Sequence, residues 1–200
     1  MQQPDGSWTW NKTGLAPLEC DDYYGAVYAA LGVGQAPEGY AASAPARQGV
    51  ARVTAYLQAQ APPNLHHKIW LLWASLTYEG LMTPAQREQT IQELLPLQRA
   101  DGGWSLPSLG NWKTRDGVGN DEPSASDGYA TGLVVYALRQ AGVSAQQDAV
   151  RRGVNWLRNN QRLSGRWFIA SLNGRTKHVI SNAGTALSVL ALKASESATR

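Results

Sequence analysis

Four residues just before a helical stretch, Glu19-Cys20-Asp21-Asp22, place three carboxylates close together. Carboxyl groups that share a dry pocket cannot all ionise easily, so one of them can keep its proton and act as an acid. Acidic residues at a helix start also have an ordinary role, because they favour the positive end of the helix dipole. The sequence therefore supports three interpretations of Asp21 and Asp22: a helix cap, an acid, or a site for a polar ligand.

The histidines and the single cysteine do not form a metal-binding pattern. His66 and His67 are neighbours that would point apart on a helix, and His178 is distant in the sequence. Zinc sites need Cys and His ligands at characteristic spacings, and no such spacing occurs. Cys20 is the only cysteine, which excludes a disulfide within the chain. We expect neither a metal nor a cofactor.

The composition predicts a chain with a sizeable core and little net charge. It has 200 residues, 43% of them hydrophobic, and a formal net charge of +3. Its basic residues are scattered, which argues against a nucleic-acid partner. No apolar run reaches the roughly 18 residues of a membrane-spanning helix. No signal peptide is visible, yet the chain opens inside a repeat, so we expect a fragment and leave the compartment open.

Seven stretches show helical periodicity, separated by segments rich in proline and glycine. The predicted helices cover about 22–34, 45–60, 65–78, 84–100, 127–140, 144–161 and 181–194. Helix starts are predicted at the capping residues Ser43 and Ser126 or Asp127, and at two capping boxes, Thr83 with Gln86 and Ser144 with Gln147. The segment 101–126 is predicted to be a long loop.

Helices of two kinds alternate along the chain. The second, fourth and sixth are apolar on one face only, whereas the first, third, fifth and seventh are apolar nearly all round. A helix that is apolar on every side is buried. The alternation predicts an all-α fold of about four outer–inner helix pairs, an α/α toroid or partial α/α barrel. We expect residues 1–200 to form one such domain, with the loop 101–126 inside it.

An ungapped alignment of the four apolar helices brings Leu31, Leu76, Leu138 and Leu192 to one level. Polar residues then coincide at the helix N-termini, at 19–22, 66–67, 126–129 and Asn182. We predict a functional site at this shared polar rim.

A pattern of Gln, Gly and Trp is repeated three times. It runs from Gln161 to Trp167 after the sixth helix, from Gln98 to Trp104, and from Gln2 to Trp8. Each copy has the spacing Gln…Gly-x-Trp, which indicates an internal repeat. We expect the glutamine to bond free carbonyls at the helix end, and the tryptophan ring to lie over that end.

The last copy continues upstream with Arg152, Gly153, Trp156 and Leu157. Together these residues resemble the QW motif of the squalene–hopene cyclase, oxidosqualene cyclase and prenyltransferase-repeat superfamily. The resemblance implies the α/α toroid fold. In the cyclase branch, it further implies a reaction that begins when a carboxylic acid protonates an alkene or epoxide.

Cyclases of that branch carry Asp-x-Asp-Asp at the position of Glu19-Cys20-Asp21-Asp22. The resemblance therefore implies that Asp21 is the catalytic acid, with Asp22 and Glu19 as tuning partners. Aromatic faces would stabilise the carbocation that follows. The candidate substrate-binding residues on the inner helices are Tyr23, Tyr24, Trp70, Trp73, His67, Asp127 and Tyr129.

Two departures from that pattern keep the function open. Glu19 replaces the first aspartate, and Tyr23-Tyr24 replace two small residues, where they would crowd a polycyclic substrate. One hypothesis is a class II terpene or triterpene cyclase-like isomerase acting on an isoprenoid. The other is a non-catalytic α/α repeat module that binds a protein, lipid or glycan, with Tyr23, Tyr24 and Trp70 packed together. Self-association, or a larger assembly that completes the barrel, is a further expectation.

Overall fold

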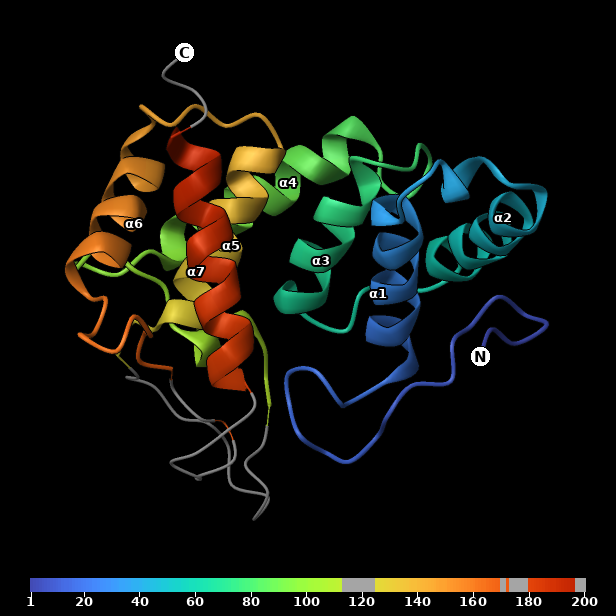
Figure 1. The fold of residues 1–200 in the computed structure, drawn as a ribbon, viewed down its shortest axis with the longest axis horizontal. Coiled ribbons are helices and arrows are strands. Elements are labelled where there is room, and N and C mark those ends of the chain that lie inside the picture. Colours follow the sequence, from blue (N-terminus) through green and yellow to red (C-terminus); the bar gives the residue numbers. More distant parts are fainter. Residues whose placement is uncertain (113–124, 170–171, 173–179, 197–200) are drawn as a thin grey trace. The chain divides into compact units, whose positions relative to one another are not determined.

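The computed structural model describes residues 1–112, 125–169, 172 and 180–196, and this part of the chain is all-helical (Figure 1). Its α-helices are α1 (Asp22–Gln35), α2 (Ala44–Gln58), α3 (Leu65–Ser75), α4 (Pro84–Leu94), α5 (Gly128–Gln140), α6 (Asp148–Asn159) and α7 (Ile180–Glu196). Short 3-10 turns lie at Tyr40–Ala42, Leu95–Leu97 and Leu106–Leu109. Across the described residues the only β-pairing is two isolated bridges, so the all-α prediction is confirmed. Most of the predicted loop 101–126 lies outside the described residues.

Most helix starts follow the predicted caps. The Ser43 hydroxyl accepts the Ala46 amide, and Asp127 accepts amides of the first turn of α5. The Thr83 amide donates to Gln86 Oε1 at 2.8 Å, and the Gln86 amide donates to Thr83 Oγ1 at 3.2 Å. This reciprocal pair is the predicted capping box, because each side chain satisfies a backbone amide that the helix leaves free.

Two predicted boundaries are wrong. The fourth helix ends at Leu94 and not near residue 100, because Pro96 has no amide to continue the hydrogen-bond ladder and the chain tightens into a 3-10 turn. The sixth helix begins at Asp148, not Ser144. The Ser144 hydroxyl accepts the amide of Gln146, a local turn, and Gln147 caps the helix by accepting the Val150 amide.

The chain divides into two compact units, 1–88 and 89–200. In the first, α1 packs against both α2 and α3, and its core includes Val27, Val53 and Leu72. In the second, α5 packs against α6 and, most extensively, against α7. Gly132 permits this close crossing, since a Cβ there would lie 2.6 Å from the Ser188 backbone nitrogen. The single domain over 1–200 stays a prediction.

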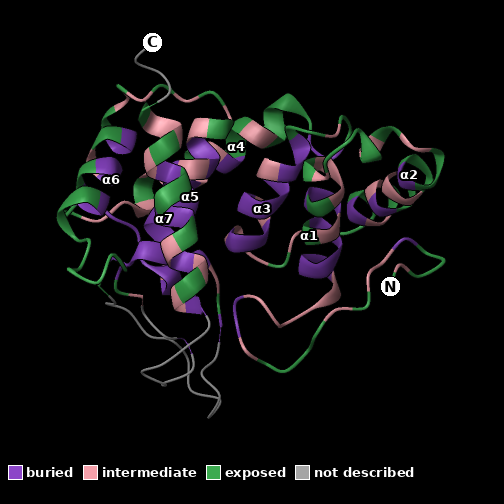
Figure 2. Ribbon diagram, in the orientation of Figure 1, coloured by how far each residue is buried: buried purple, intermediate pink, exposed green. Residues whose placement is uncertain are grey.

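The predicted alternation of buried and amphipathic helices is clearest from α2 to α5 (Figure 2). Most of α3 and α5 and half of α1 are buried, whereas α2, α4 and α6 bury one face each. The last apolar helix departs from the pattern. Val189 and Leu190 on α7 are 51% and 37% exposed, so its apolar character does not make it buried on every side.

The Gln…Gly-x-Trp repeats form three turns with the same backbone geometry. Gly6, Gly102 and Gly165 have positive φ angles of 90°, 92° and 79°, a conformation that glycine adopts without strain. In each turn the residue after the glutamine accepts the glycine amide, at 2.8–3.0 Å. This shared geometry supports the internal repeat.

The roles predicted for Gln and Trp are partly reversed. The indole N–H of Trp104 donates to the Leu94 carbonyl, and that of Trp167 donates to the Leu157 carbonyl, at 2.9 and 2.8 Å. The tryptophan, and not the glutamine, thus satisfies a carbonyl near the end of the preceding helix. Gln98 instead bonds Gly102 in its own turn and Ala149 at the start of α6, since its position beyond the 3-10 turn places it next to that helix.

Candidate functional site

The residue at the centre of the candidate site, Asp21, is the N-cap of α1. Its backbone is extended, and its Oδ1 accepts the Tyr24 amide at 2.8 Å. Its other oxygen, Oδ2, lies 3.0 Å from Nε2 of His67, a residue 46 positions further along the chain. The Asp21 side chain is 32% exposed, whereas that of His67 is 1% exposed. The cap interpretation of Asp21 is therefore correct, and the cap also faces a buried histidine.

His67 is held from both sides. It lies in the first turn of α3, where Asn64 is the N-cap. The Asn64 Oδ1 accepts the backbone amide of His67 at 3.1 Å and lies 2.7 Å from its Nδ1. His67 is predicted from the sequence to bind substrate, but both of its ring nitrogens face protein groups.

The surroundings of Asp21 favour its ionised form. Partial burial by itself would raise the pKa of Asp21. The hydrogen bonds from the His67 ring and from the Tyr24 amide outweigh that effect and lower the pKa of Asp21 below its usual value. Asp21 is thus a stronger acid than an ordinary aspartic acid.

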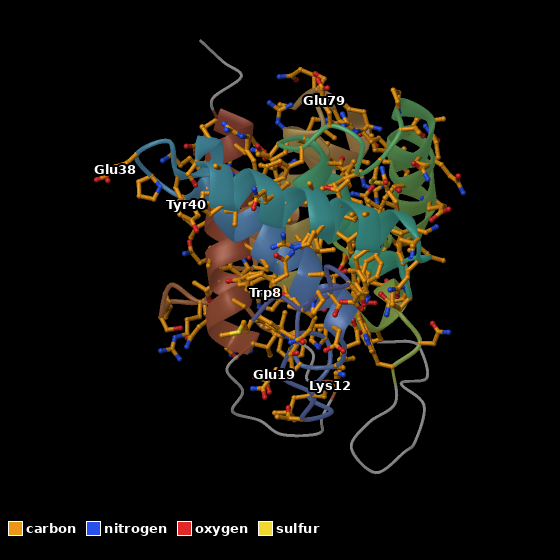
Figure 3. All side chains as sticks on the ribbon, turned by 90° about the vertical axis from the view of Figure 1, so that its right-hand side faces the viewer. Trp8, Lys12, Glu19, Glu38, Tyr40 and Glu79 are labelled. Carbon is orange, nitrogen blue, oxygen red and sulfur yellow. The ribbon has the colours of Figure 1, made fainter. Side chains whose placement is uncertain are left out.

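The other two acids bond to the loop that precedes α1. Asp22 forms an ion pair with Lys12 at 2.6 Å and accepts the Trp10 amide, while Glu19 accepts the hydroxyl of Thr13 at 2.5 Å. Figure 3 labels Lys12 and Glu19 on this loop. The predicted tuning partners therefore do not share a hydrogen bond with Asp21. The side chain that contacts the Asp21 carboxylate is that of His67.

Aromatic rings lie against the His67 side of the Asp21–His67 pair. Tyr24 is 3% exposed, stacks on His66 and Tyr28 with ring centroids 5.9 and 5.8 Å apart, and meets Trp70 edge-on at 5.7 Å. Tyr23 meets His67 edge-on at 5.8 Å. The structure thus brings Tyr23, Tyr24 and Trp70 together with the Asp21–His67 pair.

The array continues along α3. Trp70 stacks on Trp73 with centroids 5.4 Å apart, so both of these predicted wall residues join the array. His66 has a different character from His67. It is fully buried, and Trp70 donates its indole N–H to His66 Nε2 at 3.0 Å. Burial lowers the pKa of His66 well below its usual value, so it is neutral.

The last two predicted residues, Asp127 and Tyr129, belong to the second compact unit. Both are fully buried at the start of α5. Asp127 Oδ1 accepts the amides of Tyr129 and Ala130, and its Oδ2 accepts the amide of Leu106 at 2.6 Å. Burial raises the pKa of Asp127 to about 7 against the effect of these amides. Both carboxylate oxygens therefore have a structural function, as a cap and as an anchor for the preceding segment.

Asn64 was not predicted as a site residue. The signal was present, because an asparagine directly before an apolar helical stretch is a typical N-cap. What the sequence could not indicate is the second bond of the same oxygen to the His67 ring.

The described helices include none long and apolar enough to cross a membrane. Two curated enzymes are similar to parts of the chain. Labda-7,13-dienyl diphosphate synthase from Streptomyces clavuligerus is 38% identical over 74 residues, 35% of this chain. Protostadienol synthase A from Arthroderma gypseum is 31% identical over 103 residues, 48% of this chain. Each match covers 14% of the relative's own length, so the chain corresponds to a small part of either enzyme.

The family model of the squalene-hopene cyclase C-terminal domain matches residues 71–177, more than half of the chain. The matched segment begins just after His66 and His67 and contains two of the three Gln…Gly-x-Trp turns. The resemblance drawn from these turns is thereby confirmed, although Asp21 and His67 lie outside the match. On this match the chain belongs to the squalene-hopene cyclase C-terminal domain family.

Proposed function

We propose that this protein initiates cyclisation of an isoprenoid by protonating one of its double bonds, with Asp21 as the acid. The observation that carries this proposal is the contact between Asp21 Oδ2 and His67 Nε2, at the edge of a cluster of aromatic rings. Membership of the cyclase family and the similarity to two enzymes named as terpenoid synthases support the substrate class.

The reaction requires an acid stronger than an ordinary carboxylic acid, because an alkene is a weak base. A protonated His67 would supply this strength, since its positive charge stabilises the carboxylate that Asp21 becomes. In the step, the π electrons of the alkene form a C–H bond to the proton. The electrons of the broken O–H bond remain on Asp21, and a carbocation is left on the substrate.

Aromatic rings next to the acid would stabilise that carbocation. A cation over the face of a tryptophan or tyrosine ring gains about 0.5–2 kcal/mol without a nucleophile being present. Tyr28 is 48% exposed and contacts Trp70, so its ring is an accessible member of the aromatic cluster. The reaction ends when a C–C double bond forms by loss of a proton, or when water adds to the cation.

We also propose that the alternating helices form outer–inner pairs of an α/α toroid. The pattern of burial in each unit supports this arrangement. In the first unit α1 and α3 are the buried members, and in the second unit α5 is. In that arrangement the N-terminus of the buried helix α1 carries the acid.

One experiment tests the reaction. Purified protein is incubated with squalene and, separately, with a linear C20 prenyl diphosphate, and the products are analysed by mass spectrometry. We expect a cyclic isomer or its hydrate, and a loss of at least about 100-fold in the Asp21→Asn variant, as is typical when a general acid is removed. Equal conversion by the variant would contradict the role of Asp21.

A second candidate function is supported by one observation. Tyr24 packs against His66, Trp70 and Tyr28, which is the packing expected for a non-catalytic α/α repeat module. In that case the aromatic cluster is a core, and the protein binds a partner through another surface. Absence of any product from either isoprenoid, with the fold intact, would favour this function.

A further inference from the structure

Asn64 makes two bonds with one atom. Its Oδ1 accepts the backbone amide of His67, which caps α3, and the same oxygen lies 2.7 Å from His67 Nδ1. Asn64 is extended, with φ −159° and ψ −178°, as an N-cap requires. His67 is 1% exposed, so water does not compete for its ring nitrogens.

The backbone amide fixes the orientation of the Asn64 side chain. An amide N–H can only donate, so the atom that faces it must be the side-chain oxygen and not the NH₂ group. A flipped side chain would place N–H groups against each other. The same oxygen has no proton to give to His67 Nδ1. The proton in that contact must therefore belong to Nδ1.

This assignment determines what remains at the other ring nitrogen. With Nδ1 protonated, a neutral His67 offers only a lone pair at Nε2, and Asp21 must then carry the proton of the 3.0 Å contact. A charged His67 instead donates from Nε2 to ionised Asp21. In both cases one proton lies between Nε2 and Oδ2. The alternative neutral tautomer, protonated only at Nε2, is excluded.

We propose that Asn64 is a positioning residue that holds the proton of His67 on Nδ1 and so reserves Nε2 for proton exchange with Asp21. The consequence for catalysis rests on the proposed function. If His67 could shift its single proton to Nε2, it would bond ionised Asp21 while staying neutral. The pair would then lose the positive charge that makes Asp21 a strong acid. Asn64 removes this resting state.

Three substitutions separate the two bonds of Asn64. Asn64→Asp keeps an acceptor oxygen for both the amide and Nδ1. Asn64→Ser keeps an N-cap of similar strength, but its shorter side chain does not reach the ring. Asn64→Ala loses both. Ser43→Ala is the matched control, because the Ser43 hydroxyl caps α2 by accepting the Ala46 amide.

The measurement is ¹⁵N NMR of protein labelled in histidine, with the signal of His67 assigned from a His67→Gln variant. In the wild-type protein and in the Asn64→Asp variant, we expect Nδ1 to have the shift of a protonated nitrogen. In the Asn64→Ser variant we expect His67 to show a mixture of tautomers. The Ser43→Ala control should match the wild type. A merely structural cap would leave the His67 signals of the Ser variant unchanged.

Two results would overturn the inference: an unprotonated Nδ1 in the wild type, or wild-type signals in a folded Asn64→Ser variant. If the Asn64→Ser variant does not fold, the spectra of the wild type and of the Asn64→Asp variant still show whether Nδ1 of His67 is protonated. The spectra need no substrate, so their outcome is independent of the proposed reaction. If the protein cyclises an isoprenoid, kcat of the Ser variant should fall at least about 10-fold with KM unchanged, the size of effect known for hydrogen-bond partners that orient metal-bound histidines.

Discussion

Replacing Asp21 by Asn should remove the acid and leave the fold nearly unchanged. Asn and Asp are equally good N-caps, so the bond to the Tyr24 amide survives. The new NH₂ group can donate to the Nε2 lone pair of neutral His67, which preserves the second contact. Only the attraction between carboxylate and imidazolium is lost. Because about a third of the Asp21 side chain is exposed, this attraction contributes about 1 kcal/mol or less.

The pH dependence has a definite sign. Asp21 has a lower pKa in the folded protein than in the unfolded chain, so its contribution to stability is present above the unfolded pKa of 3.8. The contribution disappears as the pH falls through the folded pKa. We therefore expect the free energy of unfolding of the wild-type protein to exceed that of the Asp21→Asn variant by about 1 kcal/mol or less at pH 7. This difference should vanish in acid.

Urea unfolding followed by tryptophan fluorescence measures these free energies, and an unchanged m-value shows that the folded state is the same. Asp127→Asn is the matched control, since it makes the same change at another N-cap. There an NH₂ group must replace an oxygen that accepts a backbone amide, which should cost about 1–3 kcal/mol. If Asp21→Asn lowers the free energy of unfolding at pH 7 by more than about 3 kcal/mol, the expected small contribution of Asp21 is wrong. The Asp21–His67 pair would then be a structural ion pair.

Three other predictions concern the reaction and the helix packing. In the wild-type protein, kcat/KM should fall as the pH rises above the lowered pKa of Asp21, because only the protonated carboxyl donates; a pH–rate profile with constant or rising kcat/KM would contradict this. Trp104→Phe should cost about 2–4 kcal/mol in urea unfolding, since the buried Leu94 carbonyl loses its donor and part of the ring volume is lost; a cost below 1 kcal/mol would show that the bond is unimportant. Gly132→Ala should cost about 1–3 kcal/mol because its Cβ meets the Ser188 backbone, whereas Gly32→Ala, with open space around it, should be neutral or stabilising. Equal stability of the two glycine variants would refute the close packing of α5 and α7.

Local features were predictable because they depend on residues close in the sequence. The caps at Ser43, Thr83 and Asp127 follow from side chains that reach an amide two or three residues away. The start of α6 was mispredicted, although Ser144 with Gln147 fits the same pattern. Several polar residues in that segment compete to cap the helix, and sequence alone does not rank them.

The contacts that define the candidate site were not predictable, because they join distant residues. Asp21 and His67 are 46 positions apart, and their pairing depends on the packing of α1 against α3. Proximity in sequence suggested instead that Asp21 would interact with Asp22 and Glu19. Asp22 instead forms an ion pair with Lys12, and Glu19 accepts the hydroxyl of Thr13.

In the proposed reaction, Asp21 donates a solvent-derived proton to a carbon of the substrate. Incubation of the protein in D₂O with squalene or a linear C20 prenyl diphosphate tests this directly, with the product analysed by mass spectrometry. We expect a cyclic product that carries one deuterium in a newly formed C–D bond, and almost none of that product with the Asp21→Asn variant. A cyclic product without deuterium, or labelled product formed equally by the variant, would contradict it.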